Sequence, residues 1–180
     1  MQVLSLPMVT QQSHTHGEIN ANIMIEKDII KIELIMPAET AIGFEHAPKT
    51  PSENKAIELF KSYAIASNFF NFFTSSQLFK KQKVTTIITQ SNAVLNGIEQ
   101  KNKQPHLHEH KHHKPLQIPG HLEFVVTKTL RIKEPQLIHS MKINLFDKLP
   151  NIESVKLIVI NNGKTFHHHL SKNRSKISFN

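Results

Sequence analysis

The chain has 180 residues, a formal net charge of +8 and 13 histidines, but no cysteine. The length predicts one domain with an appendage, and the lack of cysteine excludes disulfide scaffolds, thiolate zinc fingers, iron–sulfur sites and cysteine nucleophiles. No apolar run approaches the roughly 18 residues of a membrane-spanning helix, so we expect no membrane span.

Two segments near the start of the chain alternate apolar and polar residues. In residues 18–26 the apolar side chains fall mainly on one face, and residues 30–36 repeat the same period. The polar pair Lys27-Asp28 separates the two segments, and Pro37 ends the second. Alternation of period two on both sides of a short polar turn is typical of a half-buried β-hairpin.

A helix start follows at Thr50. Proline occupies the first helical position and Glu53 completes a capping box. Apolar residues then recur at spacings of three and four up to Phe70, which predicts an amphipathic helix of about five turns laid on a sheet. The phenylalanines of residues 69–73 are expected to be core residues rather than a cofactor site.

The remaining chain is rich in strand signals around one polar interruption. Residues 84–89 predict a short third strand, and residues 92–120 become polar and proline-rich, which predicts a disordered loop. Residues 155–160 are almost all apolar, as in a central strand buried on both faces. Asn162-Gly163 is a strong two-residue hairpin signal. Other strands are predicted at residues 122–132, 141–145, 165–170 and 176–179.

These elements predict the α+β class: an antiparallel β-sheet with one long amphipathic helix on a face, interrupted by a disordered histidine-rich loop. We expect a flexible N-terminus over residues 1–13 and a single domain over residues 14–180. The histidine-rich insert within that domain spans about residues 99–120.

Metal chemistry is concentrated in the insert. Five histidines lie between Pro105 and Pro115: His106, His108, His110, His112 and His113. Neutral imidazole is a good ligand for zinc and other divalent transition metals, and histidine-rich tracts are typical of metal binding. The lysines around the tract and the entropy of ordering it predict micromolar affinity. The alternative is a solvated linker whose histidines have no ligand role.

Further histidines outside the insert predict a second, ordered site. His14 and His16 lie two residues apart, on one side of an extended segment. His46 falls in the turn before the helix, and His121 begins a strand. Together with a carboxylate, these imidazoles would hold one ion. His167 and His169 project together from a strand, but coincidental surface histidines are the favoured interpretation there.

Other functions find less support in the sequence. The chain has no nucleophile elbow, no HExxH motif and no glycine-rich phosphate loop, so we do not expect an enzyme. The positive charge invites nucleic-acid binding, but the basic residues are scattered and aromatic residues make up only 7%. We therefore expect no nucleic-acid partner.

Several motifs resemble the ZrgA-type zinc-uptake accessory proteins. The most specific is Gly-Phe-Glu-His-Ala-Pro-Lys-Thr at residues 43–50. Residues 14–17 (HTHG), 121–124 (HLEF) and 145–153 (LFDKLPNIE) agree with the same family, as does the histidine-rich insert between the two halves. The resemblance covers residue 14 to the end.

The resemblance implies a periplasmic protein that binds zinc and assists its uptake beside a zinc ABC transporter. It places His14, His16, His46 and His121 at family histidine positions, and the tract at a variable metal-rich loop. Relatives often carry two cysteines that could pair, and a signal peptide. This chain has no cysteine, and no export signal is visible in it.

Our primary hypothesis is therefore a zinc-binding accessory protein that captures divalent metal through histidines. The alternative is a non-catalytic interaction module whose exposed sheet edge docks a partner protein, with incidental histidines.

Overall fold

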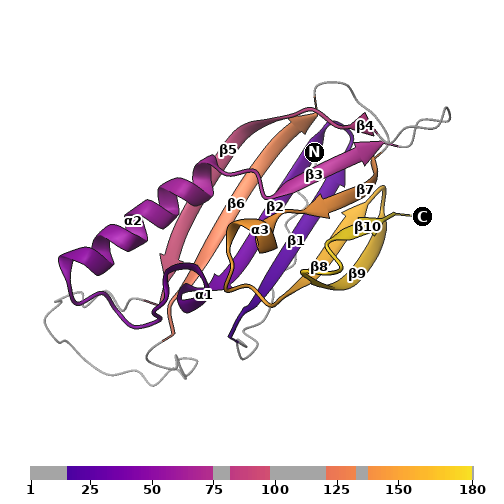
Figure 1. The fold of residues 1–180 in the computed structure, drawn as a ribbon. Helices are drawn as coiled ribbons and strands as arrows, with labels where there is room; N and C mark the ends of the chain where they lie inside the picture. Colours follow the sequence, from indigo (N-terminus) through magenta and orange to yellow (C-terminus); the bar gives the residue numbers. More distant parts are fainter. Residues whose placement is uncertain (1–15, 75–81, 98–120, 133–137, 180) are drawn as a thin grey trace, which may run out of the picture.

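The computed structural model describes residues 16–74, 82–97, 121–132 and 138–179. The described residues form ten strands and three helices (Figure 1). In chain order these are β1 (Glu18–Glu26), β2 (Ile29–Pro37), α1 (Ala38–Ile42), α2 (Pro51–Ala66), β3 (Phe70–Thr74), β4 (Gln82–Lys83), β5 (Thr86–Asn96), β6 (Glu123–Ile132), β7 (Ile138–Ile143), α3 (Leu145–Lys148), β8 (Ser154–Asn161), β9 (Lys164–Ser171) and β10 (Lys176–Ser178).

Six strands form a large sheet in the order β5-β6-β2-β1-β8-β9. The pairing of β1 with β8 is parallel, and the other neighbours are antiparallel. The predicted hairpin of residues 18–36 is confirmed as β1 and β2, whose apolar face is buried. The sequence period and the sheet therefore agree on which side chains enter the core.

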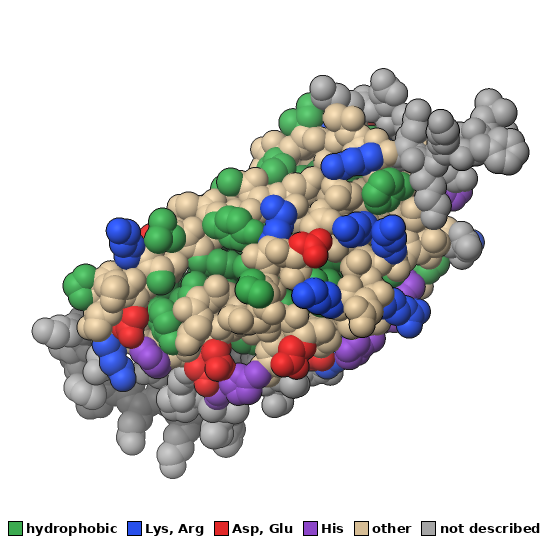
Figure 2. All heavy atoms as spheres, in the orientation of Figure 1, with side chains coloured by type: hydrophobic (Ala, Val, Ile, Leu, Met, Phe, Trp, Pro, Cys, Tyr) green, Lys and Arg blue, Asp and Glu red, His purple; other side chains and the backbone are tan. Residues whose placement is uncertain are grey.

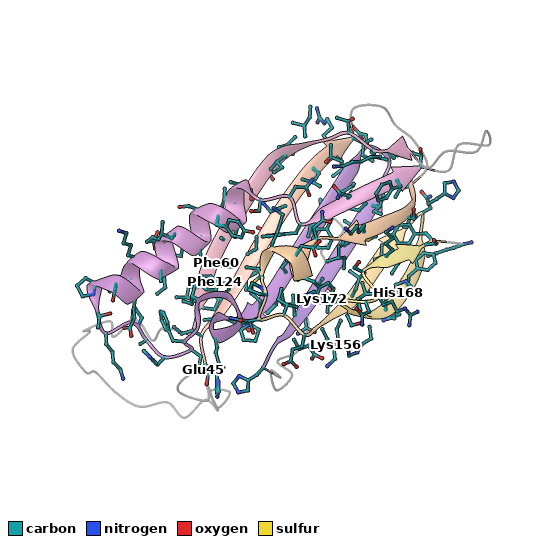
Figure 3. The ribbon with its side chains drawn as sticks, in the orientation of Figure 1. Glu45, Phe60, Phe124, Lys156, His168 and Lys172 are labelled. Carbon is teal, nitrogen blue, oxygen red and sulfur yellow. The ribbon has the colours of Figure 1, made fainter. Side chains whose placement is uncertain are left out.

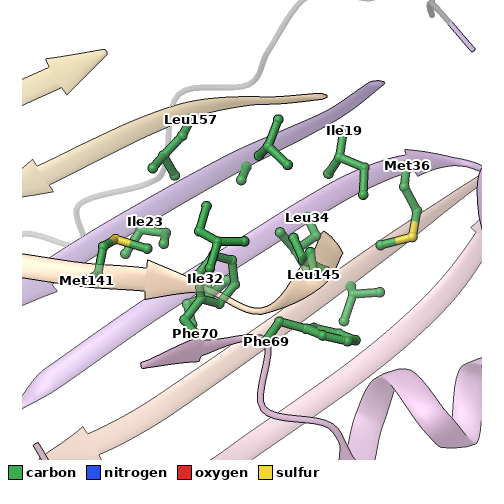
Figure 4. Packing of buried hydrophobic residues seen from close by; sticks show 14 of the residues in the cluster. Ile19, Ile23, Ile32, Leu34, Met36, Phe69, Phe70, Met141, Leu145 and Leu157 are labelled. Atoms are coloured by element: carbon green, nitrogen blue, oxygen red, sulfur yellow. The ribbon is translucent and has the colours of Figure 1, made fainter. Parts of the chain in front are cut away.

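A smaller sheet, in the order β10-β7-β3-β4, covers part of that buried face (Figure 1). Figure 4 shows the contact between the layers: Phe70 and Met141 of the small sheet lie against Ile23 and Ile32 of the large one. Helix α2 packs against β5 and β6 on the same side, where Phe60 meets Phe124 with 4.5 Å between ring centroids. One continuous core results.

The predicted α+β class is wrong, because the protein is mostly β. Its longest described helix, α2, has 16 residues and covers only the β5–β6 side of the large sheet. Two longer strand segments were missed, besides the two-residue β4. The phenylalanine-rich segment after the helix forms β3, and residues 92–96, which we expected to be loop, extend β5. The second sheet therefore covers much of the buried face of the large sheet, which we expected a long helix to cover.

The predicted helix start is confirmed, although the helix is shorter than predicted. Thr50 Oγ1 accepts a hydrogen bond from the Glu53 backbone N–H at 3.2 Å, and Glu53 accepts one from the Thr50 N–H at 3.0 Å. The helix ends at Ala66. Buried Lys128 donates to the Ile65 carbonyl at 2.7 Å, which satisfies a terminal carbonyl group of α2.

The β8–β9 hairpin turns at Asn162-Gly163, as predicted. Both residues have positive φ, +50° and +75°, the combination that a type I′ turn requires. The expectation that residues 155–160 are buried on both faces is wrong. Ile158 and Ile160 are only half-buried, because the described helices and the small sheet lie on the other face.

Candidate metal site

Three segments that are far apart in sequence meet at one end of the large sheet. Strand β1 begins where β2 ends, because Asn20 pairs with Ile35 in an antiparallel ladder. Strand β6 begins at the same end, because Pro37 of β2 pairs with Glu123. Helix α1 follows β2 without a loop. The sheet register therefore brings residues 16–17, 38–46 and 121–122 together.

Backbone hydrogen bonds fix these segments to one another. The Ala38 N–H donates to the Leu122 carbonyl at 2.8 Å, and the Leu122 N–H donates to the Glu45 carbonyl at 2.9 Å. The Gly17 N–H donates to Thr40 Oγ1 at 3.3 Å. Gly17 has φ +75°, and a Cβ there would lie 2.8 Å from the Glu153 side chain. Only glycine therefore lets His16 approach α1 in this way.

The side chains of His16, Glu39 and Glu45 converge at this end. One ligand atom from each lies within 4.8 Å of the others. The Glu39 Oε2 atom forms an ion pair with His16 Nδ1, and this oxygen is buried. Carboxylate and imidazole groups gather along the lower edge of the molecule in Figure 2. The arrangement offers one nitrogen and two oxygens to a cation.

His121 extends this group. Its Nδ1 lies 2.9 Å from Glu45 Oε2, so the imidazole can donate to a carboxylate that is itself one of the three converging groups. Gly97 also lies against His121: a Cβ on Gly97 would stand 2.5 Å from the His121 carbonyl oxygen. Gly97 and His121, the described residues on either side of residues 98–120, are therefore in contact, and His121 lies next to Glu45.

His46 lies close by but faces elsewhere. Its Nδ1 is 3.0 Å from the Ala47 carbonyl and its Nε2 is 3.9 Å from Glu53, while its ring stacks on Phe44 at 5.1 Å. Hydrogen bonds from the Lys49 and Thr50 backbone, with the charge of His46, hold the pKa of Glu53 below its usual value. His46 is therefore associated with the start of α2.

The structure brings together only part of the predicted ordered site. His16 and His121 meet through Glu39 and Glu45, whereas His46 faces Glu53. His14 and the five tract histidines lie outside the described residues. Glu39 and Glu45 were not predicted as ligands. Their signal was weak: two glutamates six residues apart, which converge only because α1 and Gly43, at φ +86°, turn the chain.

Comparison with known families identifies the chain. The model of the ZrgA family zinc uptake protein matches residues 13–179. The chain belongs to the ZrgA family. This confirms the resemblance inferred from residues 43–50 and the other motifs, and it associates the protein with zinc uptake. No curated protein matches the chain. Within the described part of this ZrgA family member, no helix is long and apolar enough to cross a bilayer.

Proposed function

We propose that this ZrgA family protein binds zinc as cargo at the convergence of His16, Glu39 and Glu45, which we name the α1 site. The observation that carries the proposal is the group of three ligand atoms, one each from His16, Glu39 and Glu45, within 4.8 Å of one another. Glu39 Oε2 is buried and contacts His16 Nδ1, and a cation bound at this point would be shared by the carboxylate and the imidazole.

The donor set suits zinc. Zinc in proteins takes nitrogen from histidine and oxygen from carboxylates, usually with four ligands in a tetrahedral arrangement. Three protein ligands leave a fourth position for water or for a group on a receiving protein. An open position allows an ion to be passed on, which suits cargo better than a permanently enclosed structural ion.

Electrostatics supports the same conclusion. The Glu39 and Glu45 ligand oxygens lie within 4.8 Å of each other and would repel as two anions. A divalent cation between them would convert this repulsion into attraction. His121 would orient the Glu45 carboxylate, because a hydrogen bond to a ligating carboxylate fixes its direction.

We further propose that the histidine tract supplies ions to the α1 site. Its five imidazoles lie at residues 106–113, within the segment whose described neighbours, Gly97 and His121, contact each other beside Glu45. Tethering raises the local concentration of tract-bound ions at the site without any new contact. The tract would hold several ions loosely and the α1 site one ion more tightly.

The cellular setting follows from the family and is part of the same proposal. A zinc uptake protein of this kind would act in the periplasm and deliver its ion to a zinc ABC transporter, without catalysing a reaction. Zinc ligation needs neutral imidazole, so affinity should fall as the pH drops below about 6.5.

Competition for zinc against a chromophoric chelator at pH 7.5 tests the proposal. We expect one tight equivalent and several loose ones in the metal-stripped wild-type protein. Replacing the five tract histidines by glutamine should remove loose equivalents and retain the tight one. His16→Gln should weaken the tight equivalent by about 10- to 100-fold or more, the range seen when residues that support a metal site are lost.

His139→Gln is the matched control, because His139 lies on β7 in the other sheet and far along the chain from the α1 site. It should leave the tight equivalent unchanged. A wild-type protein that fails to compete, or a His16→Gln variant that retains the tight equivalent, would overturn the assignment.

A further inference from the structure

A second group of imidazoles lies on β9, the edge strand of the large sheet. His167 and His169 are exposed, whereas His168 between them is half-buried. Side chains two residues apart on a strand share a face, with Cα atoms about 6.6 Å apart. The two imidazoles therefore project together from the face opposite the core.

The pair borders a hollow of about 410 Å³ that crosses three neighbouring strands. Its lining includes Asn20, Asn22, Lys156, Ile158, His167 and His169. The register accounts for the lining, because His167 lies beside Ile158 and His169 beside Lys156, while Asn22 and Asn20 continue the same two rows on β1. The hollow gives water access to an ion held by the imidazoles.

Lys156, which lines the hollow, is directed away from this pair. Lys156 Nζ lies 2.6 Å from Glu18 Oε1 on β1, and β1 and β9 lie on opposite sides of β8. The ion pair compensates the lysine charge and draws the ammonium group toward β1. Lys164 alternates to the other face of β9, together with His168. On the face that carries His167 and His169, the charge of Lys156 is therefore compensated by Glu18, which reduces its repulsion of a bound metal ion.

We propose that His167 and His169 form a second metal site, the β9 site, which binds a divalent transition ion of the zinc and copper class through two imidazoles. This site is separate from the α1 site and does not depend on it. Two protein ligands leave about two positions of a four-coordinate ion for water. The β9 site is consequently the weaker and more open of the two.

Peptide-resolved footprinting tests the β9 site in the full chain. Diethyl pyrocarbonate modifies histidines that are accessible and neutral, and zinc ligation protects them. Tryptic cleavage after Lys164 and Lys172 isolates residues 165–172, and fragmentation resolves the three histidines. We expect zinc to slow modification of His167 and His169 with the same half-saturating concentration. His139 is the internal control and should be unaffected.

Substitution distinguishes a chelate from two independent imidazoles. When one of two linked ligands is removed, binding through the other loses the advantage of proximity, so His169→Gln should raise the zinc concentration that protects His167 by about 100-fold. His167→Gln should have the reciprocal effect. Both residues are exposed, and each substitution should change folding stability by less than about 0.5 kcal/mol.

Two results would overturn the β9 site: equal modification rates with and without zinc, or protection of His167 that survives His169→Gln unchanged. His16 and His121 lie in other peptides, so loss of protection at the α1 site is scored separately from loss at the β9 site.

Discussion

Two regions of this protein present imidazoles in opposite electrostatic surroundings. At the α1 site, histidines face carboxylates: His16 contacts Glu39 and His121 contacts Glu45. At the β9 site, residues 154–179 contain no aspartate or glutamate, and the nearby Glu18 carboxylate on β1 pairs with Lys156. Figure 3 shows how far apart they lie, with Glu45 below α1 and with Lys156 and His168 on the β8–β9 side.

The difference indicates that charge compensation, rather than the number of histidines, should set the order of zinc affinity. An imidazole brings a lone pair but no charge, whereas each carboxylate also reduces the positive charge of the ion. The α1 site contributes one imidazole and two carboxylates, and the β9 site two imidazoles. We expect the α1 site to bind zinc more tightly and the β9 site to be the more selective for metals that favour nitrogen.

The largest expected effect comes from removing the charges of the α1 site. The double variant Glu39→Gln/Glu45→Gln keeps side-chain size and deletes both anions. We expect zinc affinity at the α1 site to fall by on the order of 100-fold, measured by chelator competition. Protection of His167 and His169 should be unchanged in the same protein.

Glu58→Gln is the matched control, since Glu58 is exposed on α2 and pairs with Lys61 at 2.9 Å. Equal affinity in the double variant and in this control would show that the carboxylates do not ligate the ion.

The second prediction adds a carboxylate to the β9 site. Ile158 is half-buried and lies directly beside His167 in the β8–β9 ladder. Cross-strand neighbours have Cβ atoms about 5 Å apart, so a glutamate there can reach an ion bound by the imidazoles. Ile158→Glu should raise zinc affinity of the β9 site by about tenfold, or about 1.4 kcal/mol.

Footprinting of residues 165–172 measures this gain. Ile158→Gln controls for the loss of the apolar side chain and should show a much smaller change. A glutamate that gives no more protection than the glutamine would mean that the imidazoles do not share an ion beside position 158.

Local patterns predicted the elements that depend on neighbours in sequence. The capping box at Thr50 and Glu53 and the turn at Asn162-Gly163 form through contacts within a few residues, and β1 and β2 pair as neighbours in the chain across a short turn. The phenylalanines after α2 misled the helix prediction, because a short apolar run does not distinguish a buried strand from the continuation of a helix. Ser67, the C-cap residue, ends the helix instead.

The α1 site could be predicted only in part, because it depends on long-range register. His16 meets Glu39 through the β1–β2 pairing, and Glu45 meets His121 across 76 residues. Adjacency in sequence does not bring His46 into the site. His46 follows Glu45 directly, yet its ring faces Glu53 at the start of α2. Composition indicated metal binding, but only the fold identifies the carboxylates that complete the site.

A smaller effect is expected from the ion pair beside the β9 site. Glu18→Gln leaves Lys156 without its anionic partner and frees a cation near His169. Zinc affinity of the β9 site should fall by about threefold, the size of a partly exposed charge interaction. Adding Lys156→Met to this variant should restore the affinity. If the single variant retained full protection of His169, the lysine charge would not reach the site.

The smallest effect concerns His168, the inward-facing member of the same triplet. Burial lowers the pKa of His168, and the charges of Arg174 and His167 lower it further. The unfolded state, with a histidine pKa near 6.5, therefore binds the proton first as the pH falls. Stability from this group is constant above about pH 6.5 and decreases below it.

Between pH 7.5 and pH 5.5, the free energy of unfolding should therefore fall more in the wild type than in His168→Gln. Denaturant titration of the metal-free proteins measures that shift. The same comparison between wild type and His139→Gln gives the baseline, because His139 lies on β7 of the small sheet and not on β9. A shift no larger than this baseline would show that the edge histidines respond to pH only through metal binding.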